Sequence, residues 1–154
     1  MSGFWQRLRR LEWPTLAVLA GCYALWLALV FSSGLLPWPL IAVGLTLATA
    51  LHSSLQHESV HNHPTPWPGV NEVLVFPSLW MVMPWRRYRD AHMAHHRTGR
   101  LTDPLEDPES FYLDTSSWAR CPAPIKTLLA LQSSLIGRLL FGPPIAFARL
   151  LLDD

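Results

Sequence analysis

Two long apolar runs near the start of the chain constrain its fold more than any other feature of the sequence. The first, from Pro14 to Phe31, contains no charged residue. As a helix, its 18 residues would rise roughly 27 Å, which is close to the thickness of the hydrocarbon core of a bilayer. The second run, from Leu40 to Leu55, is uncharged, and its polar residues gather toward its end. We therefore expect both runs to form transmembrane helices.

The composition agrees with a membrane protein. Half of the chain is hydrophobic, 15% is charged and the mean hydropathy is +0.19. The net charge of +1 provides no extended basic field, so the composition does not favour binding to nucleic acid. The two cysteines, Cys22 in an apolar run and Cys121 in a polar stretch, provide no disulfide framework.

The segments around the two runs predict a hairpin with a defined orientation. Residues 32–39 (SSGLLPWP) form a short uncharged turn between the runs. Basic residues lie before the first run and after the second: Arg7, Arg9 and Arg10, then Arg86, Arg87 and Arg89. By the positive-inside rule, we expect the N-terminus and the histidine-rich segment after the second run on the cytoplasmic side. A cleaved signal peptide is the alternative for the first run, which exceeds the usual apolar core of about 7–15 residues.

The rest of the chain predicts shorter elements at the membrane surface. Residues 62–69 (NHPTPWPG) contain three prolines and should end the second helix, and the apolar segment 72–84 is too short to span. We expect a cytoplasmic helix over 85–99, a soluble acidic loop over 101–124, and two interfacial segments within 125–154, separated at Gly142-Pro143-Pro144. The predicted fold is all-α: an integral membrane protein with two transmembrane helices in a hairpin plus cytoplasmic or interfacial helices.

Five of the seven histidines form two groups, HESVH (57–61) and HMAHH (92–96). Histidines three or four residues apart lie on one face of a helix, with about 5–6 Å between their Cβ atoms. Neutral imidazole is a good ligand for Zn, Fe, Cu or Ni. We therefore predict five metal ligands: His57, His61, His92, His95 and His96. His52 and His63 lie outside both groups, and we expect them to form hydrogen bonds or to support the ligands.

The first group also satisfies the pattern H-E-x-x-H, in which two helical histidines bind zinc and the glutamate is the general base for peptide hydrolysis. An intramembrane zinc metalloprotease with Glu58 as its base is therefore an alternative function. Such a site needs one more protein ligand and an open position for water. The second group supplies three histidines, and this excess of ligands counts against hydrolysis.

The two groups and their surroundings resemble the membrane-bound fatty acid desaturase and hydroxylase family over roughly residues 14–110. HESVH has the form of that family's first histidine box, H-x-x-x-H, and HMAHH has the form of its second, H-x-x-H-H. The resemblance implies that the five predicted ligands bind a non-haem di-iron centre that activates O2. It also implies desaturation or hydroxylation of a lipid acyl chain, with electrons from a ferredoxin-like or similar donor.

The third histidine box of that family has the form H-x-x-H-H or Q-x-x-H-H, and no histidine follows His96 in this chain. Gln132 is followed by SSL and does not match the form. We therefore expect a single desaturase-like domain over residues 1–154 that stops before the third box, so that a full di-iron site is not assembled from this chain alone unless another chain completes it. A third interpretation is a non-catalytic membrane protein that binds metal weakly or not at all.

Overall fold

The computed structural model describes residues 5–6, 8–80 and 83–152, and every regular element among them is a helix. The named helices are α2 (Trp13–Phe31), α3 (Trp38–Val60), α4 (Pro68–Val75), α5 (Trp85–His95), α6 (Thr115–Arg120), α7 (Ala123–Gln132) and α8 (Leu135–Leu152). The prediction of an all-α fold is confirmed. Arg7 of the predicted basic start and residues 81–82 of the predicted interfacial segment lie outside the described residues. The chain divides into two compact units, residues 1–90 and 91–154.

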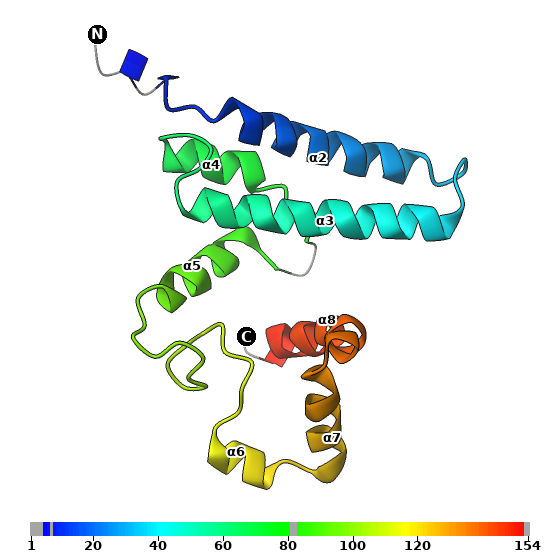
Figure 1. Cartoon of the computed structure of the whole chain (residues 1–154), viewed down its shortest axis with the longest axis vertical. Coiled ribbons are helices and arrows are strands. Elements are labelled where there is room, and N and C mark those ends of the chain that lie inside the picture. Colours follow the sequence, from blue (N-terminus) through cyan, green and yellow to red (C-terminus); the bar gives the residue numbers. More distant parts are fainter. Residues whose placement is uncertain (1–4, 7, 81–82, 153–154) are drawn as a thin grey trace. The chain divides into compact units, whose positions relative to one another are not determined.

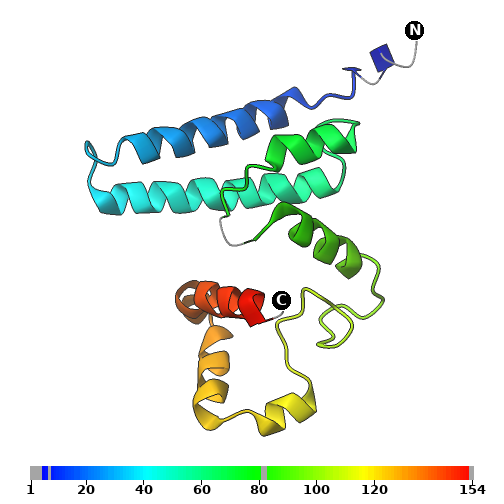
Figure 2. The same cartoon turned by 180° about the vertical axis from the view of Figure 1, so that it is seen from behind.

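Helices α2 and α3 form a hairpin and lie side by side (Figures 1 and 2). Both are long and apolar enough to cross a membrane, as predicted. Helix α3 extends beyond the second apolar run, because it begins at Trp38 and continues to Val60, with His61 as its C-cap residue. The helices approach closely at Gly44, where an added Cβ would lie 2.7 Å from Cδ1 of Leu29 on α2.

Most apolar side chains of this hairpin point away from the protein. Only 11% of the apolar stretch of α2 and 22% of that of α3 is buried. Large exposed side chains occur on both helices: Val18, Leu25, Leu27 and Phe31 on α2, and Leu40, Val43, Leu47 and Leu51 on α3. Apolar side chains left uncovered over the length of a membrane-spanning helix are suited to contact with lipid.

The first unit has one small core, to which four helices contribute. Its buried members are Leu19 and Cys22 of α2, Leu55 of α3, Val75 of α4 and Trp85 of α5. Beside the core lies the fully buried His52, whose Nε2 is 2.8 Å from the hydroxyl of Tyr23. The same hydroxyl is 3.1 Å from the carbonyl oxygens of Leu74 and of Pro77. His52 thus forms a hydrogen bond, as expected, and Tyr23 links the hairpin to the segment that follows α4.

The loop between α3 and α4 is held mainly by hydrogen bonds. The amide side chain of the buried Asn71 accepts from the N–H of Thr65 at 3.0 Å and donates to its carbonyl at 2.8 Å. His63 is hydrogen-bonded through Nδ1 to Glu12, which confirms the expected hydrogen bond. Helix α4 begins at Pro68, so the turn predicted over 62–69 is shorter than expected and the apolar segment 72–84 starts inside a helix.

The second unit begins in α5 and contains more helix than the sequence predicted. Helix α5 ends at His95 rather than at Gly99, although the N–H of His96 still donates to the carbonyl of His92 at 3.0 Å. The segment predicted as a loop over 101–124 includes α6, because Asp114 caps the amides that begin this helix. Hydrogen bonds from Ser116 and Ser117 hold the pKa of this carboxyl far below its usual range.

Helices α7 and α8 meet at a bend of 120°. The predicted break at Gly142-Pro143-Pro144 is wrong, because these residues lie inside α8 and the chain bends before it. Ser134 explains the position of the bend: its hydroxyl donates to the carbonyl of Leu131 at 2.8 Å and accepts from the N–H of Gly137 at 3.1 Å. One serine therefore terminates α7 and caps α8. The pair amounts to a third candidate span only if it is taken as one broken helix.

Candidate metal centre

The first histidine pair lies at the end of α3. His57 is in the last turn, and His61 is the C-cap residue, with its N–H donating to the carbonyl of Glu58 at 3.0 Å. The two ring centroids are 4.8 Å apart, and both side chains are partly exposed. Their ligand atoms also lie within 4.8 Å of one another. The extension of α3 beyond the apolar run is what places both imidazoles on one helix end, as the spacing predicted.

The second histidine cluster lies at the end of α5. His92 is buried, with 6% of its surface exposed, and its Nε2 is 3.0 Å from Nε2 of His96. His95 lies beside this pair, with its ring centroid 6.0 Å from that of His92 and 5.7 Å from that of His96. The three imidazoles are therefore gathered at one helix end, and His92 and His96 are the closest two.

Two carboxylates from the loop after α5 form hydrogen bonds with Nδ1 atoms of this cluster. Nδ1 of His92 is 2.8 Å from Oε1 of Glu109, and Nδ1 of His95 is 2.8 Å from Oδ1 of Asp107. The hydrogen bond to Asp107 raises the pKa of His95. Although burial opposes ionisation of Asp107, hydrogen bonds from His95 and from two backbone amides lower the pKa of that carboxyl.

No such role was predicted for these carboxylates, because the acidic composition of residues 101–124 indicated a soluble loop. Asp107 is in fact buried, with 2% of its side chain exposed. A signal was present in the sequence: Asp107-Pro108-Glu109 follows the second histidine group closely, with prolines that stiffen the loop. Carboxylates commonly bind the distal nitrogen of metal-ligating histidines, and the pattern could have been interpreted in that way.

The chemistry of these donors fits a transition metal. Imidazole nitrogen suits Zn, Fe, Cu and Ni. Two nitrogens about 2.0–2.1 Å from one ion and at right angles to each other lie about 3 Å apart. That matches the separation of 3.0 Å between Nε2 of His92 and Nε2 of His96. The histidines described by the structure therefore include a cluster that can hold a metal ion, and the identity of that ion does not follow from nitrogen ligands alone.

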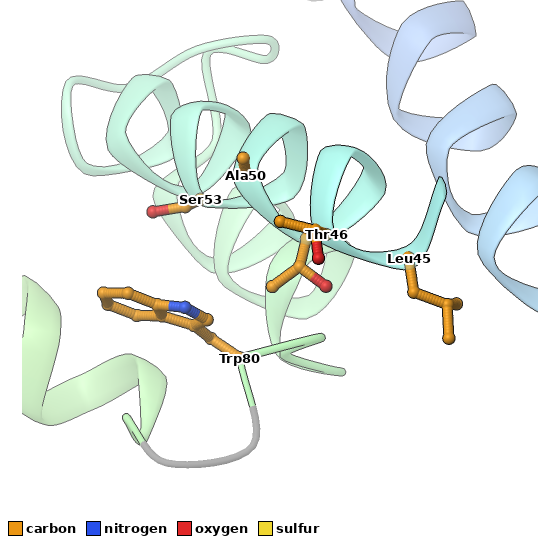
Figure 3. Close-up of a pocket in the computed structure, with 6 residues that line it drawn as sticks. Leu45, Thr46, Ala50, Ser53 and Trp80 are labelled. Carbon is orange, nitrogen blue, oxygen red and sulfur yellow. The ribbon is translucent and has the colours of Figure 1, made fainter. Parts of the chain in front are cut away.

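A groove of about 510 Å³ runs along one face of α3 in the first unit. Figure 3 shows its lining, with the indole of Trp80 lying across from the helix. The groove is lined by Leu45, Thr46, Thr49, Ala50, Ser53 and Trp80. Ser53 and His57 are four residues apart on α3. The groove therefore lies on the helix face that also carries the first histidine of the first pair.

The fold and the histidines define a helical protein with two candidate membrane spans and a cluster of imidazoles able to bind metal. A family model described as Fatty acid desaturase matches residues 34–152, from the turn after α2 to the end of α8. The chain belongs to the fatty acid desaturase family. This match extends past the segment on which the sequence resemblance rested and includes α6, α7 and α8. No curated protein and no solved structure matches the chain.

Proposed function

We propose that this chain is an O2-dependent oxidoreductase that desaturates or hydroxylates a lipid acyl chain. The family match supports this class of reaction. The observation that carries the proposal within the chain is the second histidine cluster, where two imidazole Nε2 atoms lie 3.0 Å apart. A chain of this family with imidazoles in this arrangement is equipped to hold a redox metal.

The proposed metal is iron, bound as a di-iron centre by His57, His61, His92, His95 and His96. Further ligands would come from outside these two clusters. Iron held by these nitrogens would supply the activation of O2 needed to attack an unactivated C–H bond. The protein's own part is to keep each imidazole neutral and correctly oriented, because a protonated imidazole does not bind metal.

The proposed reaction balances with an external donor of two electrons. Desaturation consumes O2, two electrons and two protons, removes two hydrogen atoms from the acyl chain and releases two molecules of water. Hydroxylation consumes the same reactants, inserts one oxygen atom into a C–H bond and releases one molecule of water. The donor would be a ferredoxin or a similar one-electron carrier that acts on the cytoplasmic face, where we place the N-terminus and both histidine groups.

The groove along α3 is a candidate site for the acyl chain. The groove runs along α3, which is apolar enough to cross a membrane, on the helix face that carries His57. Ala50 lies in this groove, so the larger side chain in Ala50→Leu should reduce oxidation of long acyl chains. Ala24→Leu on the exposed surface of α2 provides the matched control. Equal oxidation by the two variants would remove the groove from the proposal.

The proposed reaction can be tested in cells that express the full chain and receive a deuterium-labelled saturated fatty acid. Mass spectrometry of the extracted lipids should show a product that has lost two hydrogens or gained one oxygen atom. His92→Ala should abolish this product, whereas His63→Ala, which changes a histidine outside both groups, should retain it. The proposed function would be contradicted by a product of equal yield from His92→Ala.

A further inference from the structure

The acidic loop after α5 is built around one buried carboxylate. Oδ2 of Asp107 accepts from the N–H of Thr102 at 2.8 Å, and Oδ1 accepts from the N–H of Glu109 at 2.9 Å. The same Oδ1 lies 2.8 Å from Nδ1 of His95. The hydroxyl of Ser110 closes the loop by donating to the carbonyl of Thr102 at 2.8 Å. Asp107 therefore joins the loop backbone to the histidine cluster.

Glu109 is placed by that arrangement. Its backbone N–H is held by Asp107, and its side chain, which is 32% exposed, extends to Nδ1 of His92 at 2.8 Å. An ionised carboxylate has no hydrogen to donate, so Nδ1 of His92 must carry the proton in this bond. A neutral imidazole has one N–H only, and its other nitrogen then carries the lone pair. Glu109 therefore directs the lone pair of His92 to Nε2, the atom that faces His96.

The same reasoning applies to His95, whose Nδ1 faces the carboxylate of Asp107. We propose that Glu109 and Asp107 are positioning residues for the second histidine cluster, and that they fix His92 and His95 as Nδ1–H tautomers with Nε2 as the metal-binding atom. The inference rests on the proposed function, because it assigns a role to the loop only if the cluster binds metal. It extends that function to residues outside the histidine boxes.

The inference also accounts for the contact between Nε2 of His92 and Nε2 of His96. With the lone pair of His92 on Nε2, the proton in this contact belongs to His96. For Nε2 of His96 to bind metal, this proton must move to Nδ1 of the same ring, because the ligating nitrogen needs a lone pair. The tautomer of His92 is thus set in advance by Glu109, whereas His96 must change its tautomer to bind the ion through Nε2.

The first test uses the metal-free full chain in detergent micelles, labelled with ¹⁵N in its histidines. The ¹⁵N chemical shifts should show His92 as the Nδ1–H tautomer in the wild type and a mixture of tautomers in Glu109→Ala. Glu106→Ala is the matched control, because this carboxylate belongs to the same loop and its side chain binds Arg100 instead. A His92 that keeps the same tautomer in Glu109→Ala would overturn the role of Glu109.

The second test titrates the same proteins with Co²⁺, whose visible absorption reports binding. Loss of a carboxylate behind a metal-binding histidine usually weakens metal affinity by about 10–100-fold, and we expect that loss for Glu109→Ala and for Asp107→Ala. Glu106→Ala should bind as the wild type does. Glu109 is partly exposed, so Glu109→Ala can be evaluated even if Asp107→Ala does not fold. An affinity equal to that of the wild type in Glu109→Ala would overturn the proposal.

The two tests separate this inference from the proposed function. If the wild type binds no Co²⁺, the proposed metal site is wrong, while the tautomer of His92 still decides whether Glu109 orients the imidazole. If the wild type binds Co²⁺ and Glu109→Ala binds it equally well, the metal site stands and the positioning role is wrong.

Discussion

Glu58 is the residue at which the oxidoreductase and protease interpretations differ. It lies between His57 and His61 in the sequence, and its carboxylate is 3.7 Å from Nδ1 of His57, with 52% of the side chain exposed. In an H-E-x-x-H protease this glutamate is the general base, and activity is lost without it. In a desaturase-like site it is one polar residue at a helix end.

We predict that Glu58→Gln retains both bound metal and lipid oxidation. The amide has nearly the same shape as the carboxylate but no basic oxygen, so the substitution removes general-base chemistry selectively. Metal content and lipid products of the variant can be measured beside those of the wild type. Retained metal together with the loss of a peptide-cleaving activity would instead favour the protease.

Tyr23 is a second residue with a testable role, here in stability. Its hydroxyl contacts His52 and the carbonyls of Leu74 and Pro77. Tyr23→Phe removes the hydroxyl and leaves these groups without their hydrogen-bond partner. We expect this loss to reduce the free energy of unfolding by about 1–3 kcal/mol. Denaturant unfolding in detergent provides the measurement. Tyr112→Phe, at a side chain with 62% exposure, is the control and should have no effect.

Among the helices, the bend between α7 and α8 brings the backbone very close to one glycine, Gly137. A Cβ on Gly137 would lie 1.8 Å from the carbonyl oxygen of Leu131, a backbone atom that cannot move aside as a flexible side chain can. Alanine usually stabilises a helix relative to glycine by roughly 0.5–1 kcal/mol. Here the steric overlap opposes that gain.

We therefore predict that Gly137→Ala destabilises the bend by about 1–3 kcal/mol, the usual cost of inserting atoms into a packed site. Hydrogen exchange should become faster in α7 and α8. Gly21→Ala in α2 is the control, because a Cβ there meets no atom within 4 Å. Slower or unchanged exchange in Gly137→Ala would show that the bend is not packed as described.

The elements also show what the sequence could and could not predict. The apolar runs and the four-residue spacing of the histidines are local patterns, and they predicted α2, α3 and the ends that carry the imidazoles. The roles of Asp107 and Ser134 depend on contacts made after folding. Asp107 is buried because the loop closes over it, and Ser134 bends the chain because its hydroxyl replaces backbone partners. The sequence alone identifies Asp107 as a polar residue of a predicted loop and Ser134 as a polar residue of a predicted interfacial segment.

At the scale of the whole molecule, the proposed orientation predicts which segments face the cytoplasm. With two spans, residues beyond α3 share the side of the N-terminus. Cys121 is partly exposed, while Cys22 is buried, so Cys121 is the natural target for a thiol reagent. In intact cells a membrane-impermeant maleimide should not label Cys121 but should label an added cysteine in Ser33→Cys, in the turn after α2. The reverse pattern would contradict the orientation.

Metal analysis of the purified full chain measures whether the two histidine groups bind iron, as proposed above. Protein produced in medium that contains both iron and zinc would be analysed by mass spectrometry for each metal. We predict iron in the wild type and in His63→Ala, and its loss in His61→Ala and His92→Ala. Zinc without iron in the wild type, or equal iron in all four proteins, would contradict it.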